Sequence, residues 1–121
     1  MKRMIFVNLP VADVSASRRF FGALGFTFNE MFSDENAACM VIEENIFAML
    51  LAKPRFKDFI PGEIAEPSRG VEVLNCLSCE SRAEVEALLE KAFAAGAKPW
   101  MPNQDLGFMF NGSFQDLDGH V

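Results

Sequence analysis

Histidine and cysteine, the side chains that most often serve as bases, nucleophiles or metal ligands, are rare in this chain of 121 residues. The single histidine, His120, stands in the final stretch SFQDLDGHV. Asp116, Asp118 and Gly119 in that stretch are typical of a tight turn, because each tolerates turn geometry. We therefore interpret His120 as a structural or exposed residue at the edge of a turn, and we assign no catalytic residue.

The three cysteines are Cys39, Cys76 and Cys79, and the last two form the sequence CLSC. A CxxC pair can be a redox motif or half of a zinc site, but no second CxxC completes such a site here. A strand would also direct residues three apart to opposite faces. An odd number of cysteines without a signal peptide favours reduced thiols. We interpret the pair as ordinary thiols in an apolar strand.

Charge and hydropathy exclude several kinds of partner. The net charge is −6 and the pI is about 4.7, so the chain repels phosphate backbones and nucleic acid is not expected as a partner. No apolar run approaches the ~20 residues that cross a bilayer, so no membrane contact is expected. The apolar N-terminal stretch is cut short by Pro10 and Asp13, and we interpret it as a strand of a cytoplasmic protein.

The first half of the chain predicts one helix among several strands. Residues 4–9 form a short apolar strand, and residues 11–26 predict a helix with Asp13 or Ser15 as its N-cap and Gly25 after its end. Three further apolar runs of strand length follow at residues 26–32, 37–43 and 45–52.

Residues 53–70 contain three prolines, two glycines and many charges, so they favour no long helix or strand. They are either a surface connection or a lid over a pocket, since loops of this length are often functional. Phe56, Phe59 and Ile60 would be unusual in a loop that only connects two halves.

The pattern then repeats. Residues 71–79 predict a strand, and residues 80–96 predict a helix in which Ser81 and Glu84 form a capping box. Strand and turn residues fill the remainder. The chain of 121 residues is thus expected to be one domain made of two similar modules, residues 1–52 and 71–121, joined by residues 53–70.

At this point the sequence resembles the glyoxalase/bleomycin resistance/extradiol dioxygenase superfamily, also called the vicinal oxygen chelate fold. Phe21 replaces the tyrosine of the family pattern, and Leu117 replaces the proline of its final turn. The resemblance implies an α+β fold with two βαβββ modules that form a curved mixed sheet around a central cleft, and it commonly implies a homodimer. It also implies that the last strand of the second module is cut short here. The matching residues are Val11, Asp13, Ser17, Phe20, Leu24, Gly25 and Phe26, with DLDGHV at the end.

Members of the superfamily that use a metal hold one divalent ion with two side chains from each module. The resemblance places three of these ligands at Phe6, Met49 and Leu74, and the fourth shortly after His120, beyond Val121. Phenylalanine and leucine cannot bind a metal ion, and methionine is a poor ligand for a hard one. No carboxylate stands at these three positions to move a proton. We therefore expect no metal or other cofactor.

The same positions would give a cleft with an apolar floor. This floor is either ordinary core or a pocket for a small organic molecule, with Asn8 as the orienting group. Metal-free binding with no assigned reaction is the leading hypothesis. The alternatives are a metal-dependent lyase or dioxygenase resembling lactoylglutathione lyase, and a drug-sequestering protein similar to bleomycin resistance proteins. The candidate cleft residues are Phe6, Asn8, Met49, Leu74 and Cys76.

Overall fold

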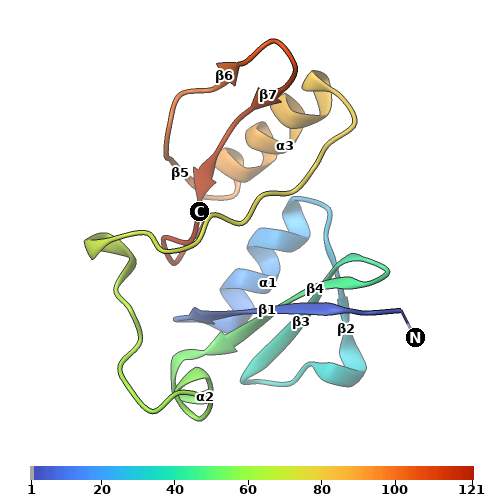
Figure 1. Ribbon diagram of the computed structural model, residues 1–121. Helices are drawn as coiled ribbons and strands as arrows, with labels where there is room; N and C mark the ends of the chain where they lie inside the picture. Colours follow the sequence, from blue (N-terminus) through green and yellow to red (C-terminus); the bar gives the residue numbers. More distant parts are fainter. Residues whose placement is uncertain (1) are drawn as a thin grey trace. The chain divides into compact units, whose positions relative to one another are not determined.

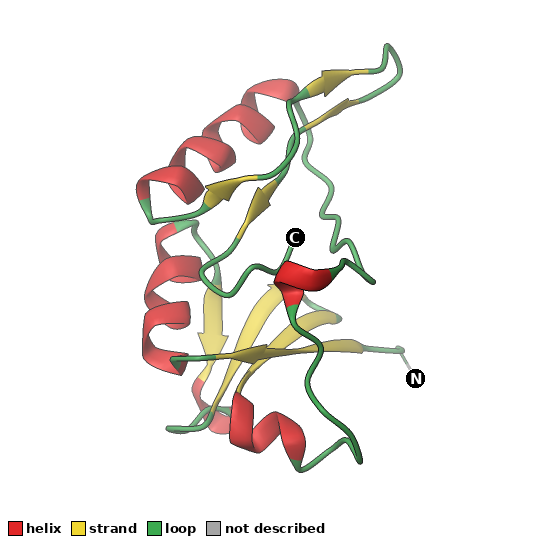
Figure 2. Ribbon diagram, turned by 90° about the vertical axis from the view of Figure 1, so that its left-hand side faces the viewer, coloured by secondary structure: helices red, strands yellow, loops and turns green. Residues whose placement is uncertain are grey.

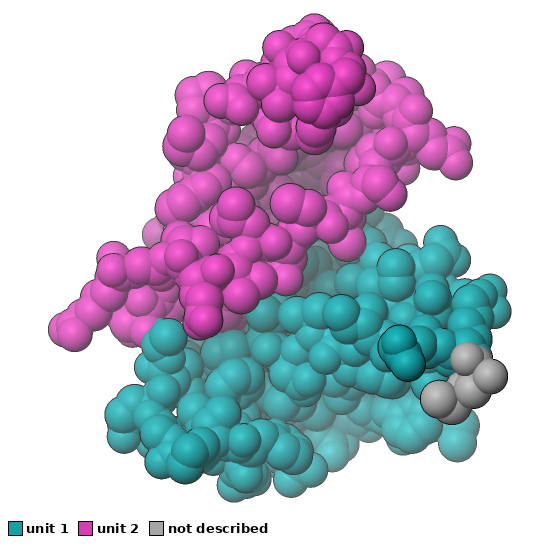
Figure 3. Space-filling model, in the orientation of Figure 1, with its two compact units in different colours: residues 1–65 teal, residues 66–121 magenta. Residues whose placement is uncertain are grey.

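The computed structural model describes residues 2–121, which divide into two compact units. Unit 1 comprises residues 1–65 and unit 2 comprises residues 66–121 (Figure 3). The buried apolar residues are distributed unevenly between the units. In unit 2 only Leu89 and Ala92 are buried apolar residues among those described, whereas unit 1 contains the rest, including Val11, Phe20 and Leu50.

Unit 1 has the order β1, α1, β2, β3, β4 that the sequence predicts for the first module (Figure 1). Its sheet is mixed, because β1 pairs with β4 in parallel while β2–β3 and β3–β4 are antiparallel. The strand order is β1-β4-β3-β2. The elements are β1 (Ile5–Val11), α1 (Val14–Ala23), β2 (Thr27–Asn29), the 3₁₀ turn η1 (Glu30–Phe32), β3 (Ala37–Glu43) and β4 (Ile46–Ala52).

Helix α1 begins and ends where the sequence predicts. The Asp13 side chain accepts a hydrogen bond from the Ala16 N–H at 3.0 Å, which satisfies one free donor of the first turn. Gly25 follows the helix with a φ of 106°, a conformation that suits glycine. Val14, Ser17, Phe20 and Phe21 are the buried residues of the helix and form its inner face.

The two faces of the unit 1 sheet differ in character. Because side chains alternate along a strand, Ala48 and Leu50 on β4 share one face, and Met49 and Leu51 share the other. Ala48 and Leu50 are buried, and α1 contacts β3 and β4 (Figure 2). We call the second face the open face; it carries Phe6, Asn8, Ala37, Cys39, Phe47, Met49 and Leu51.

The segment between the two predicted modules is partly helical. It contains α2 (Lys53–Lys57), with a proline in its first turn, and the 3₁₀ turn η2 (Pro67–Arg69). The boundary between the two units lies within this segment, between Ala65 and Glu66. Its interpretation as a lid remains a prediction.

Unit 2 is built around α3 (Arg82–Ala94), which starts with the predicted capping interaction. The Ser81 hydroxyl accepts a hydrogen bond from the Glu84 N–H at 3.1 Å. The Glu84 carboxylate accepts one from the Glu80 N–H at 2.6 Å, one residue earlier than in the usual capping box. Within residues 2–121, no helix combines the length and the apolar character that a bilayer crossing requires.

The strands of unit 2 are much shorter than the sequence predicts. They form two antiparallel pairs, β5–β8 and β6–β7. Residues 71–79, expected as a strand, are not in one. A strand requires a hydrogen-bonded neighbour, and the backbone contact found there is a bond from Asn75 N–H to the Val121 carbonyl at 2.9 Å. The short strands are β5 (Lys98–Pro99), β6 (Gln104–Asp105), β7 (Phe110–Asn111) and β8 (Phe114–Gln115).

The predicted turn near His120 is a closed loop organised by one buried carboxylate. Asp116 is only 5% exposed, and its Oδ1 accepts hydrogen bonds from the N–H groups of Asp118 and His120, each at 2.9 Å. Its backbone N–H donates to the His120 carbonyl at 2.9 Å. Gly119 has a φ of 87°, which favours glycine. The loop thus gives the DLDGH sequence a structural role.

Replacing Asp116 tests this role. Asp116→Ala leaves two N–H groups without their acceptor, so we expect the free energy of unfolding to fall by ~1–3 kcal/mol in urea denaturation. Asp116→Asn keeps an acceptor and is expected to lose less. Asp34→Ala is the matched control, because the exposed Asp34 carboxylate accepts a similar bond from the Asn36 N–H.

The natural chain and Asp116→Asn also differ in pH dependence, because only the natural chain has a titratable group at this position. Burial raises the pKa of Asp116 above its ordinary value of 3.8. Its contribution to stability is therefore fully present below the unfolded pKa and is lost as the pH rises through the folded pKa. We expect the melting temperature of Asp116→Asn to gain on that of the natural chain between pH 4 and pH 7. A melting temperature of Asp116→Asn that falls relative to that of the natural chain over this pH range would contradict a raised pKa at Asp116.

Candidate functional site

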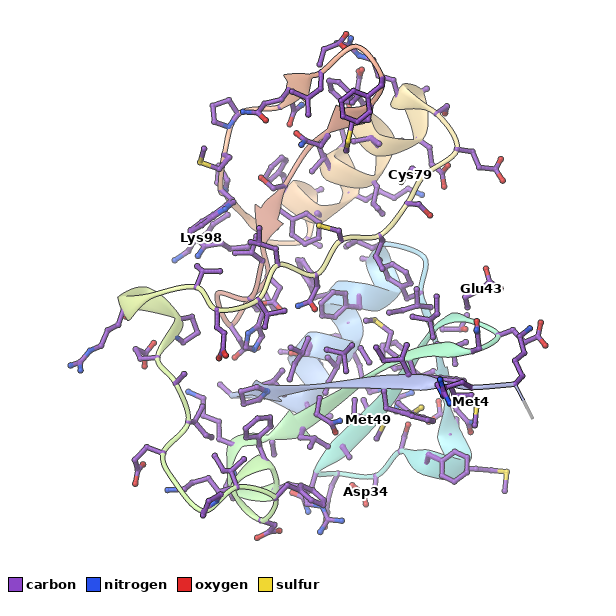
Figure 4. All side chains as sticks on the ribbon, viewed as in Figure 1. Met4, Asp34, Glu43, Met49, Cys79 and Lys98 are labelled. Atoms are coloured by element: carbon purple, nitrogen blue, oxygen red, sulfur yellow. The ribbon has the colours of Figure 1, made fainter. Side chains whose placement is uncertain are left out.

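The open face of the unit 1 sheet brings together three of the five predicted cleft residues. In the parallel pair β1–β4, Phe6 is opposite Phe47 and Asn8 is opposite Met49. Residues opposite one another in a ladder point to the same face, so Phe6, Asn8 and Met49 share the open face. Figure 4 labels Met49 on β4.

These side chains make few interactions that hold them in place. The Phe6 ring stacks on Phe47 with centroids 4.8 Å apart and remains 45% exposed. Asn8 is exposed, and its Nδ2 donates to the Phe6 carbonyl at 3.1 Å, which fixes the amide along its own strand. Met49 is half-buried. The polar group and the apolar group at the centre of the face are therefore both accessible.

A hollow of about 290 Å³ lies beside Asn8 and Met49, within unit 1. Its floor comes from the strands β1, β3 and β4, and its sides come from η1 and the residues after it and from α2 and the turn after it. Ligand pockets in proteins combine apolar side chains with polar groups, and this hollow, with six apolar and four polar or charged lining residues, lies at the small end of the usual size range. The lining residues are Asn8, Met31, Phe32, Ser33, Asp34, Ala37, Met49, Leu51, Arg55 and Phe59.

The sequence did not identify most of the side walls. Phe59 was noted as unusual for a connecting loop, and it does line the hollow. Met31 and Phe32 are predicted only as the end of the strand of residues 26–32. Asn29 caps η1 by accepting a hydrogen bond from the Met31 N–H at 3.0 Å, and this cap is the local signal that could have located the wall.

Two charged side chains lie in the lining. The Arg55 guanidinium is 3.7 Å from an Asp58 carboxylate oxygen and 5.4 Å from the Phe59 ring centroid. The Asp34 carboxylate accepts a hydrogen bond from the Asn36 N–H at 2.7 Å, as in an Asx turn. The Arg55–Asp58 ion pair is exposed, so it contributes ~0–1 kcal/mol to stability and leaves Arg55 available.

The other two predicted cleft residues, Leu74 and Cys76, lie in unit 2 within residues 71–79, and both are exposed. All three cysteines are free thiols. Burial raises the pKa of the Cys79 thiol, and the nearby Glu84 carboxylate raises it further. A reactive cysteine needs a lowered pKa, so Cys79 lacks the electrostatics of a reactive thiol.

The positions at which the resemblance implies metal ligands do not fit a divalent ion. Phe6, Met49 and Leu74 offer no oxygen or nitrogen side-chain donor, and the Phe6 ring is engaged with Phe47. Within residues 2–121, no three His, Cys, Asp or Glu side chains are grouped so that they could hold a metal ion. We therefore derive no chemistry that passes through a metal.

Comparison with known proteins adds three findings. Residues 3–43 match the sequence family described as the bleomycin resistance protein-like N-terminal region. The structure of a hypothetical protein from S. aureus matches with a TM-score of 0.83 and 25% identity, covering 99% of this chain and 90% of the other. A search of curated proteins gives no match.

Two further structures match this chain at lower sequence identity. A glyoxalase-related enzyme from Fulvimarina pelagi matches with a TM-score of 0.81 and 20% identity, covering 99% of this chain and 84% of the other. A bleomycin resistance determinant encoded on the transposon Tn5 matches with a TM-score of 0.63 and 16% identity, covering 98% and 92%. The structural matches confirm the predicted α+β fold class, and the match of residues 3–43 to the bleomycin resistance protein-like family supports the resemblance.

The side chains of Phe6, Met49 and Leu74 lack donors for a divalent ion, and this can be tested by adding metal ions. We expect zinc, nickel or manganese to produce no saturable rise in the melting temperature of the natural chain. The positive control is Asn8→His with Met49→His, which places two imidazoles opposite each other on neighbouring strands. A saturable rise at micromolar metal for the natural chain itself would contradict our assignment.

Proposed function

We propose that this chain, which has the fold of the glyoxalase/bleomycin resistance/dioxygenase superfamily, binds a small organic molecule in the hollow of unit 1 without a metal ion. The observation that carries the proposal is the pairing of Asn8 with Met49, which places an exposed amide beside an accessible thioether at the floor of the hollow. Such a floor can bury an apolar ligand and orient it through one hydrogen bond.

The side chains at the floor favour binding over catalysis. General acid–base chemistry requires a titratable group within hydrogen-bond reach of the reacting atom. Asn8 and Met49 at the floor cannot exchange a proton at neutral pH, and the Asp34 carboxylate in the side wall is engaged in an Asx turn. A lyase or dioxygenase resembling lactoylglutathione lyase would need metal ligands at positions that carry apolar side chains, so we assign no reaction.

A neutral fluorescent probe, N-phenyl-1-naphthylamine, tests the location of binding. We expect Met49→Glu to weaken its binding by at least ~10-fold, because an ionised carboxylate at the floor costs desolvation when an apolar ligand covers it. Met101→Glu is the matched control, since Met101 is an exposed methionine of unit 2.

Circular dichroism of both variants separates loss of binding from loss of folding. Asn8→Asp provides a second test at an exposed position that the fold tolerates more easily. Equal binding of the probe to the natural chain, Met49→Glu and Asn8→Asp would overturn the proposed site.

Drug sequestration is a second candidate function, and the match of residues 3–43 to the bleomycin resistance protein-like region favours it. In this proposal two copies of the chain form a homodimer, and the net charge of −6 attracts a cationic drug.

Isothermal calorimetry with bleomycin tests this candidate. We expect saturable binding that weakens as the salt concentration rises, because the attraction between unlike charges is screened. Light scattering on the same sample checks for a dimer. The absence of heat at millimolar drug would remove this candidate and leave the proposed binding in the hollow unaffected.

A further inference from the structure

The sides of the hollow expose large apolar side chains to solvent. Met31 is 87% exposed and Phe32 is 63% exposed, both on η1, and Phe59 after α2 is 66% exposed. All three line the hollow of unit 1. Aromatic rings and a thioether at the edge of a concave surface are well suited to contact the faces and edges of a flat ring.

Among the lining residues, Arg55 carries the positive charge. Its distance of 3.7 Å to the Asp58 carboxylate is too long for a hydrogen bond, and its guanidinium stands 5.4 Å from the Phe59 ring centroid. An arginine side chain offers five N–H donors in a planar fork that matches a carboxylate. Arg55 can therefore form two hydrogen bonds to an anionic ligand from a position near the Phe59 ring.

Asp34, the negative charge of the lining, is engaged differently. Its Oδ1 accepts a hydrogen bond from the Asn36 N–H, and its own backbone N–H donates to the Ala37 carbonyl at 2.8 Å. The carboxylate thus helps to form the turn that precedes β3. Arg55 has the 3.7 Å ion pair with Asp58 and no shorter side-chain hydrogen bond among the residues described, so its N–H donors can turn to a ligand.

We infer that the hollow is selective for planar aromatic anions, such as an aromatic carboxylate, with Arg55 as the residue that determines this selectivity. The inference rests on the proposed function, because it names the class of ligand for the same site. The ring contacts Phe59 and Phe32, the carboxylate accepts hydrogen bonds from Arg55, and Asn8 and Met49 form the floor beneath. The ligand is small, in keeping with the volume of about 290 Å³.

Three naphthalene probes of the same shape and different charge test the inference. They are 2-naphthoate, the neutral 2-naphthamide and the cationic 2-naphthylmethylamine, each titrated into isotope-labelled protein and followed by NMR. We expect shifts at Asn8, Met49 and Phe59, and a dissociation constant about tenfold lower for the acid than for the amide, as a charge-assisted pair with arginine provides.

Variants of Arg55 test whether this residue causes the preference for the acid over the amide. Arg55→Gln is expected to weaken the binding of the acid to the level of the amide, so that the difference between the two probes disappears. Arg55→Lys is expected to keep part of the preference, because the charge remains and the planar fork is lost. The matched control is Arg19→Gln, an exposed arginine on α1, which should bind all three probes like the natural chain.

Two kinds of failure are distinguishable. Equal affinity for the acid and the amide would overturn the selectivity and leave the proposed binding site in place. The same holds if the amine binds most tightly and Asp34→Asn removes that preference. The absence of shifts around the hollow with all three probes at millimolar concentration would overturn the proposed function, and the inference with it.

Discussion

The parallel pairing of β1 with β4 is the constraint on which the rest of unit 1 depends. The two strands are separated in sequence by a helix and two further strands, and their register sets Asn8 beside Met49. A shift of one residue would move Asn8 to the face that α1 covers, where a polar amide would be buried beside Ala48 and Leu50. The apolar residues under α1 therefore fix which side chains face the hollow.

The two faces of this sheet contribute differently to the stability of the unit and to ligand recognition. Small and medium apolar side chains such as Ala38, Ala48 and Leu50 are fully covered and provide stability. The opposite face keeps Phe6, Asn8 and Met49 accessible, and segments outside the sheet supply the walls around part of it. Recognition thus uses the accessible residues of the second face, while Ala37, Cys39 and Leu51 on that face are buried and also contribute to stability.

Much of this arrangement follows from the sequence. The caps Asp13 and Ser81, together with strand-length apolar runs, correctly indicated α1, α3, β3 and β4, because these signals are local. The strand expected at residues 71–79 depends on a distant hydrogen-bonding partner, which no local pattern can reveal. The same reason explains why the sequence could place Asn8 and Met49 on one face, since they alternate within regular strands, whereas it could not place Arg55 and Phe32 beside them. Their positions follow from the course of irregular segments.

The uneven core described for the two units has a consequence for local opening of the backbone. Unit 1 holds nearly all of the buried apolar residues, whereas unit 2 depends on Leu89, Ala92 and the carboxylate of Asp116. Segments with few buried apolar groups open at a lower free energy than segments with many. Amide protons of β5 to β8 will therefore exchange with solvent while those of β3 and β4 remain protected, and residues 98–115 are where fluctuation and proteolytic cleavage will concentrate.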